Sequence, residues 1–216
     1  MLVNETLNTI LRSLYISGTA TLLSLTWSIP ASYFLALKER SRFFETLVEA
    51  LVGMPTVLLG LLLYFVLSSS GPLAPLKLLY TPQAIIIGES ILVTPLIISV
   101  NYRLLKNAIR TYSELALSLG ANRIQTMSLV LRETMPGITA SAIMGFSRAI
   151  GELGVAMMVG GNISGHTRVL ATAIALGVAK GEFEEAVFLG FILLAITMII
   201  AVTLKYLSKV YEEWYA

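Results

Sequence analysis

The sequence predicts an all-α membrane protein with about five transmembrane helices, and three observations support this class. Its mean hydropathy is +0.81. Apolar residues make up 56% of the chain and charged residues only 13%, whereas a soluble domain usually carries about 25% charged residues. The apolar stretches are continuous, unlike the alternating strands of a membrane β-barrel. The 216 residues accommodate five spans of about 20 residues with their loops, so we expect one transmembrane domain over residues 1–216.

Five long apolar segments are the expected spans. In chain order they are residues 13–37, 45–67, 83–101, 138–159 and 186–207. Residues 1–12 place apolar side chains at helical spacing beside polar ones, which predicts an interfacial helix before the first span. Residues 169–179 are also apolar but too few to cross a bilayer, so we expect a short helix buried against the outer face.

Prolines and glycines indicate where the expected spans bend. Pro30 and Pro95 are tolerated inside a bilayer because neighbouring helices can satisfy the carbonyl groups that a proline frees. The segment Gly53-Met54-Pro55 predicts a bend in the second span.

Basic residues are distributed unevenly between the two sides of the membrane. The loops assigned to the inner side contain ten of them: Lys38, Arg40, Arg42, Arg103, Lys106, Arg110, Arg123, Arg132, Lys205 and Lys209. The loops assigned to the outer side contain four: Arg12, Lys77, Arg168 and Lys180. Because basic residues favour the cytoplasmic side, we expect the N-terminus outside and the C-terminus in the cytoplasm.

Several residue types are missing, and their absence excludes classes of chemistry. The chain has no Cys and no Asp, and its single His is His166. A catalytic triad, an HExxH zinc site and an aspartyl dyad are therefore excluded. The pattern G-x4-G-K-[ST] of a phosphate-binding loop does not occur in the sequence either. We expect no catalytic residue, no metal site and no cofactor, and the chain alone cannot hydrolyse ATP.

The longest polar interruption contains residues 113–127, which predict a short amphipathic helix. Ser113-Glu114 is a favourable helix start, and three apolar residues, Leu115, Leu119 and Met127, fall roughly on one side of a helix. Gly120 interrupts this segment. The alternative is an ordinary surface helix that joins two spans.

The fourth span contains two ionisable residues, Arg148 and Glu152. An isolated charge at the bilayer centre costs about 2.5–3.5 kcal/mol, but residues four apart on a helix can pair. Nearby small residues, including Ser141 and Gly145, allow close approach of another helix. These four residues are candidates for an anion path or gate; the alternative is a buried ion pair that only orients helices. For Glu89, in the third span, we favour a structural hydrogen-bonding role.

Several motifs together resemble the permeases of ABC importers. Glu114-x-Ala116-x3-Gly120 resembles their EAA loop, the cytoplasmic helix that docks on the ATPase subunit. The stretch from Gly145 to Gly154, followed by residues 157–163, resembles the permeases of tungstate and molybdate importers. Residues 70–82 and 167–176 are similar to the tungstate branch in particular. The resemblance covers about residues 13–208, with one departure: Arg132-Glu133 stands where the EAA pattern has Leu-Pro.

The resemblance implies a type I ABC-importer permease fold and a tungstate importer that works by alternating access in the cytoplasmic membrane of a prokaryote. The implied partners are two copies of an ATPase, an extracytoplasmic tungstate-binding protein, a second copy of this chain and membrane lipid, but no nucleic acid. The implied ATPase-coupling residues are Glu114, Ala116, Gly120, Ala121 and Arg123. The alternatives are the same machine carrying molybdate or another oxyanion such as sulfate, and, more remotely, a self-sufficient secondary transporter or channel.

Overall fold

A computed structural model describes residues 2–38 and 42–215, with side chains for residues 5–38 and 43–206. The described residues form helices and no strand, which confirms the all-α class. The α-helices are α1 (Leu2–Ala36), α2 (Arg42–Val52), α3 (Thr56–Leu67), α4 (Pro82–Ser118), α5 (Arg123–Glu133), α6 (Met135–Ile150), α7 (Gly154–Gly160), α8 (Leu170–Lys180) and α9 (Phe183–Tyr215). A short 3-10 helix, Ala74–Leu76, lies between α3 and α4.

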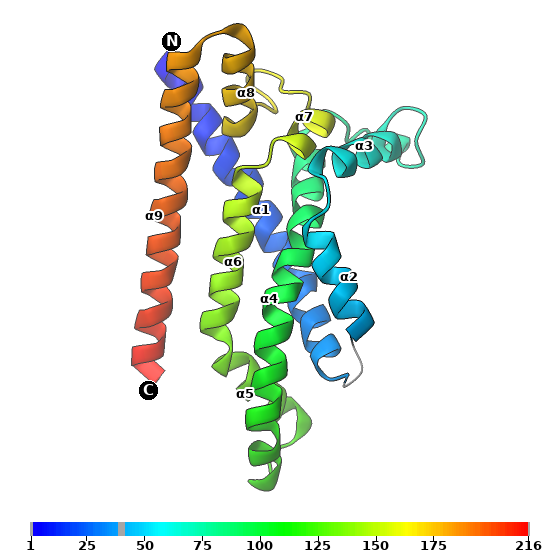
Figure 1. Ribbon diagram of the computed structural model, residues 1–216, viewed down its shortest axis with the longest axis vertical. Helices are drawn as coiled ribbons and strands as arrows, with labels where there is room; N and C mark the ends of the chain where they lie inside the picture. Colours follow the sequence, from blue (N-terminus) through cyan, green and yellow to red (C-terminus); the bar gives the residue numbers. More distant parts are fainter. Residues whose placement is uncertain (1, 39–41, 216) are drawn as a thin grey trace.

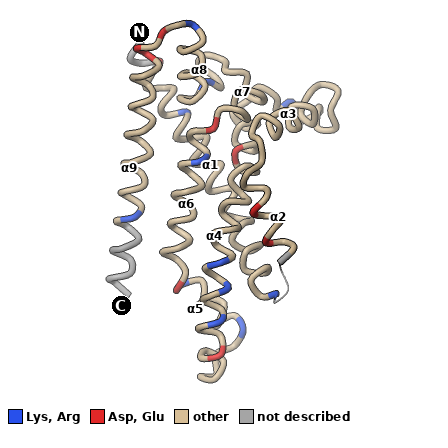
Figure 2. The backbone as a smooth tube through the Cα atoms, viewed as in Figure 1, with Lys and Arg blue, Asp and Glu red and all other residues tan. Residues whose placement is uncertain are grey.

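Helix α4 is the centre of the molecule and α9 is at its edge (Figure 1). α4 packs against α1, α2, α3, α5, α6 and α7, whereas α9 packs mainly on α8 and α6. In the most apolar 18-residue stretch of each helix, 56% of the residues are buried for α4 and 6% for α9. Figure 2 shows that the long middle of α9 carries no charged side chain. α9 therefore presents an apolar surface of the kind that lipid covers.

Helix α1 carries a stripe of small hydroxyl residues on the side that faces α4 and its neighbours α6 and α8. Seven of them are buried: Thr9, Ser13, Ser17, Thr21, Ser24, Ser28 and Ser32. The Ser24 and Thr94 hydroxyl oxygens lie 2.9 Å apart across the α1–α4 interface. Other hydroxyls donate to the carbonyl four residues earlier, as Ser13 does to Thr9 at 2.8 Å. Small side chains with satisfied hydroxyls let the two backbones approach closely inside a membrane.

The hydroxyl stripe also affects which helices are apolar enough to span a membrane. Among the described residues, α4 and α9 meet the length and hydropathy requirements, and the pairs α2–α3 and α6–α7 do so if each bent pair is one span. Helix α1 is long enough but is not among them. Its Ser and Thr residues lower its hydropathy, and they are buried on one side of the helix, whereas large apolar residues such as Leu22 and Phe34 are exposed on the other.

Two of the expected spans are bent pairs of helices. α2 and α3 meet at 95° across residues 53–55, where the sequence predicts a bend, and α3 projects sideways from the molecule beside α7 (Figure 1). α6 and α7 meet at 57° across residues 151–153, inside the expected fourth span, where we predicted no break. Gly151 caps α6 and Gly154 begins α7, so this pair of glycines is the signal that the prediction missed.

Three further expectations need comment. Residues 1–12 are not a separate interfacial helix, because α1 continues unbroken from Leu2. The expected third span, 83–101, is only the first part of α4, which runs on to Ser118. The short helix expected at 169–179 is present as α8. Part of the basic segment at residues 38–42, which the orientation argument used, falls on residues 39–41 and lies outside the described residues.

The small residues of the fourth span lie where helices touch, as predicted. A Cβ atom added to Gly145 would lie 2.8 Å from the Cδ1 atom of Ile97 on α4. One added to Gly160 would lie 2.6 Å from the Cδ1 atom of Ile85, also on α4. Both distances are shorter than a carbon–carbon contact of about 3.5 Å, so a larger residue fits only if the isoleucine side chain or the helices shift.

Candidate coupling end and intramembrane ion pair

The C-terminal end of α4 is closed by a glycine-dependent turn. Gly120 has φ +83°, a left-handed conformation that favours glycine. Its N–H donates to the Leu117 carbonyl at 3.0 Å, and the Ala121 N–H donates to the Ala116 carbonyl, also at 3.0 Å. These two bonds are the pattern of a Schellman cap, which satisfies carbonyl groups that a helix end would leave without partners.

Helix α5 begins immediately after this turn with a capping box. The Gln125 N–H donates to the Asn122 side-chain oxygen at 2.9 Å, and the Asn122 N–H donates to the Gln125 side-chain oxygen at 2.8 Å. Residues 113–127 are therefore not one helix. Ser113 and Glu114 continue α4, since the residues before them are already helical, and the new helix starts at Asn122-x-x-Gln125. That pair is a helix-start signal that our sequence analysis did not use.

The turn between α4 and α5 extends beyond the other helices (Figure 1), and large apolar side chains in and beside it are exposed. We call this surface the coupling end: Leu115, Leu117, Leu119, Ile124 and Met127. Leu119 is 80% exposed and Ile124 is 74% exposed. Basic side chains are concentrated on the adjoining part of α4 and α5 (Figure 2). A group of exposed apolar side chains of this kind, with charges beside it, is typical of a protein-binding site.

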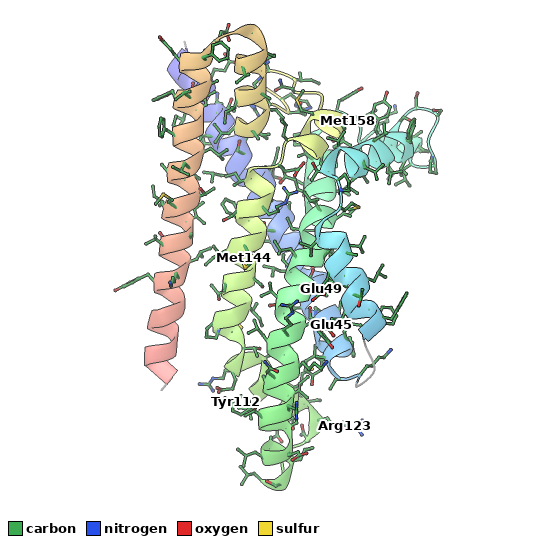
Figure 3. All side chains as sticks on the ribbon, viewed as in Figure 1. Glu45, Glu49, Tyr112, Arg123, Met144 and Met158 are labelled. Atoms are coloured by element: carbon green, nitrogen blue, oxygen red, sulfur yellow. The ribbon has the colours of Figure 1, made fainter. Side chains whose placement is uncertain are left out.

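The predicted coupling residues lie in and around this surface. Glu114 and Arg123 are exposed, and Figure 3 shows Arg123 extending away from the helices. Ala116 is buried against the rest of the hairpin, and Ala121 is half-buried. Gly120 and Ala121 form the turn, whereas Glu114 and Arg123 are exposed and accessible to a partner.

The predicted pair of Arg148 and Glu152 is confirmed at the α6–α7 bend. An Arg148 guanidinium nitrogen lies 2.6 Å from Glu152 Oε2. The other carboxylate oxygen of Glu152 accepts from the Val155 N–H at 3.2 Å. The Glu152 side chain is only 2% exposed, whereas that of Arg148 is 39% exposed. One carboxylate thus links the last turn of α6 to the first turn of α7 and holds a partly exposed cation.

A second buried acid, Glu89 of α4, lies in the same region. It is 1% exposed, and it has a hydrogen bond with Ser17 of α1 and an electrostatic interaction with Glu152. Its Oε2 atom has no hydrogen-bond partner among the described residues. The hydrogen bond to Ser17 agrees with the structural role that we favoured for this residue.

The other two path candidates face a different direction from the open side of α6. Ser141 and Gly145 are buried, and Gly145 contacts α4 and α1. Ser147 is exposed on the opposite face of α6, and Met144 is exposed on the side between Ser147 and Ser141. Arg148 lies between the two faces, so it alone of the four candidates combines a charge with partial exposure.

Comparison with known proteins identifies the family of this chain. A family model described as binding-protein-dependent transport system inner membrane component matches residues 20–213. The chain belongs to this family. It therefore has the type I ABC-importer permease fold and is embedded in the membrane through several helices, and the predicted resemblance is confirmed. A permease of this family implies an ATPase and a binding protein as partners.

Several curated relatives are similar to this chain over most of its length. The chain is 38% identical to the tungstate uptake system permease protein TupB of Peptoclostridium acidaminophilum, over 87% of this chain and 83% of the relative. It is 35% identical to a probable anion ABC transporter permease protein of Haloferax volcanii, covering 86% and 83%. It is also 35% identical to TupB of Campylobacter jejuni, covering 72% and 65%. Sulfate and molybdenum transport permeases are more distant relatives, at 24–29% identity.

Proposed function

We propose that this chain is the membrane permease of an ATP-driven tungstate importer and that the coupling end binds the ATPase subunit. The observation that carries the proposal is the exposed apolar surface around Leu119 and Ile124 on a family member without a nucleotide-binding loop. Energy must then come from a partner that this surface contacts. Tungstate is the proposed cargo because two similar relatives are tungstate uptake permeases.

The proposed assembly is a homodimer of this chain on two ATPase copies, with an extracytoplasmic tungstate-binding protein on the other side. The coupling end then lies in the cytoplasm, with the N-terminus outside and the C-terminus inside. The distribution of basic residues supports this orientation.

Continuous α4 is the proposed lever between the ATPase and the membrane interior. Its 37 residues span about 55 Å at about 1.5 Å per residue. Near its start, a Cβ atom on Gly88 would lie 2.4 Å from a methyl carbon of Val155 on α7. Because these helices touch so closely, movement of the coupling end is transmitted to the α6–α7 bend. Such rigid-body movement would switch the dimer between inward-open and outward-open states.

Arg148 is the residue that we propose meets the passing anion, and Glu152 positions it. A guanidinium already paired with a carboxylate attracts an oxyanion weakly, which suits transport because the anion must leave as well as enter. Ser141 and Gly145 support this helix from its packed face. Specificity for tungstate then lies mainly in the binding protein.

The test is ATP hydrolysis by the complex that co-purifies with the tagged full chain, reconstituted in lipid. Binding protein loaded with tungstate, molybdate or sulfate is added in turn, and we expect the largest stimulation with tungstate. Largest stimulation by molybdate or sulfate would assign the same machine to that anion. If no ATPase co-purifies, the coupling assignment is wrong and a self-sufficient transporter becomes the better explanation.

A matched pair of glycine variants tests the coupling end itself. Gly120 and Gly165 both have positive φ, and both have open space where a Cβ would be placed. We expect Gly120→Trp to abolish the stimulation or lose the ATPase, and Gly165→Trp, which carries the same backbone strain elsewhere, to keep both. Equal behaviour of the two variants would contradict ATPase binding at this turn.

A further inference from the structure

Two adjoining cavities lie where the beginnings of α1 and α9 meet α8. The polar cavity has a volume of about 250 Å³, and its charged lining residues are Glu5, Arg168, Lys180, Glu182 and Glu185. The apolar cavity has a volume of about 420 Å³, and its apolar lining residues are Leu7, Ile10, Phe188, Leu189 and Ile192. Thr6, Glu185 and Leu189 line both cavities. The two cavities therefore form one groove with a charged end and an apolar end.

The apolar end of this groove opens between α1 and α9. α9 packs mainly on α8 and α6, and Figure 1 shows α1 starting beside α9 and then running away from it behind the other helices. Since α9 lies at the edge of a membrane-embedded protein, bilayer lipid has direct access to this gap. The charged end lies among the first residues of α1 and α9 and the end of α8, where the chain leaves the apolar segments.

The charges at the polar end are only partly matched to each other. A guanidinium nitrogen of Arg168 lies 3.5 Å from Glu5, and the Lys180 ammonium lies 3.8 Å from Glu182. Both are long pairs, and each has a partner that is about half exposed. Glu185 has no ion-pair partner among the described residues. The groove thus offers one unmatched carboxylate beside two loosely held cations.

We propose that this groove binds one phospholipid that carries a primary amine, of the phosphatidylethanolamine type. The amine lies at Glu185, the phosphate lies near Arg168 and Lys180, and an acyl chain fills the apolar end between α1 and α9. An anionic lipid without an amine would leave Glu185 unmatched. A helix from a second copy would place an apolar surface against five charged residues, so it fits the groove less well than lipid does.

Native mass spectrometry of the purified full chain tests the proposal, with phosphatidylethanolamine and phosphatidylglycerol added separately in detergent. We expect one retained phosphatidylethanolamine per chain, with a preference of about tenfold over phosphatidylglycerol from the charged contact. Ile192→Trp fills the apolar end and should remove this lipid. Ile199→Trp makes the same substitution on an exposed part of α9 that does not line the groove, and it should retain the lipid.

A second pair of variants tests the charged end without risk to folding, because both residues are exposed. Glu185→Gln removes the amine partner and should bring the two lipids to roughly equal binding. Glu184→Gln changes the neighbouring residue, which does not line the groove, and should keep the preference. Retained preference in Glu185→Gln, or equal lipid binding in the two Trp variants, overturns the proposal. So does an Ile192→Trp variant that separates two copies of the chain while lipid binding is unchanged.

Discussion

Exposed surfaces are usually polar and buried regions usually apolar. The coupling end and the α6–α7 bend depart from this pattern in opposite ways. The coupling end lies beside charged residues at the tip of the molecule (Figure 2), yet it exposes most of Leu119 and Ile124. The bend is buried within a membrane protein, yet it contains the Arg148–Glu152 pair and the further acid Glu89. Each region places side chains in an environment that costs them free energy, and that cost falls when a partner supplies the missing contacts.

The two regions differ in what their neighbours within the chain provide. Most polar groups at the bend have partners in the chain itself: Glu152 accepts from both Arg148 and Val155, and Ser17 hydrogen-bonds Glu89, whose Oε2 atom has no partner among the described residues. At the coupling end the backbone is fully capped, but the apolar side chains have no cover. Substitutions at the bend should therefore change stability, whereas substitutions at the coupling end should change binding to a partner.

The largest expected effect follows from removing the partner of the buried carboxylate Glu152. Arg148→Ala leaves Glu152 buried without its counter-charge, and we expect the free energy of unfolding to fall by about 3 kcal/mol. Denaturant unfolding in detergent micelles measures this loss. Arg103→Ala breaks the ion pair with Glu49, whose members are 62% and 45% exposed, and should cost less than about 1 kcal/mol. Equal losses in the two variants would mean that Glu152 finds another partner or reaches water.

The next effect comes from the close contact between α6 and α4. In Gly145→Val the new side chain would overlap Ile97, and we expect a loss of about 2 kcal/mol in the same unfolding assay. Gly18→Val is the matched control, because a Cβ atom at Gly18 of α1 has no atom within 4 Å. Its expected change is within about 0.5 kcal/mol. A similar loss at both positions would show that glycine is required for reasons other than space.

A smaller and local effect is expected at the start of α5. Asn122→Ala removes one half of the capping box and should cost about 1 kcal/mol. Amide hydrogen exchange should become faster in the first turn of α5 and stay unchanged at the α6–α7 bend. Uniform faster exchange throughout the molecule would indicate that α5 and the membrane helices unfold as one unit.

The smallest stability effect should accompany a large effect on binding. Leu119→Ser alters an exposed side chain, so we expect the free energy of unfolding to change by less than about 0.5 kcal/mol. The affinity for the ATPase subunit, measured by surface plasmon resonance on detergent-solubilised protein, should fall about tenfold. Leu76→Ser makes the same exposed change in the loop between α3 and α4 and should bind normally. Reduced binding in both would indicate general damage instead of a local interface.

Composition and short-range spacing were enough to predict much of this protein. Continuous apolar stretches predicted helices in a membrane, because a bilayer leaves backbone groups no partner outside the segment itself. The four-residue spacing of Arg148 and Glu152 predicted their contact, and Gly53-Met54-Pro55 predicted the bend between α2 and α3. The motif around Glu114, Ala116 and Gly120, with the motifs of the fourth span, predicted the permease family.

The tertiary structure alone decided which surfaces are buried and where long helices end. Residues 113–118 carry a helix-start signal, yet they continue α4, since extending an existing helix costs less than starting a new one. Gly145 packs against Ile97 of α4, and the hydroxyl stripe of α1 is buried while its other side is exposed; both depend on contacts between residues far apart in the chain. The groove between α1 and α9 likewise exists only because segments far apart in the chain lie side by side, and no local pattern in the sequence predicts this arrangement.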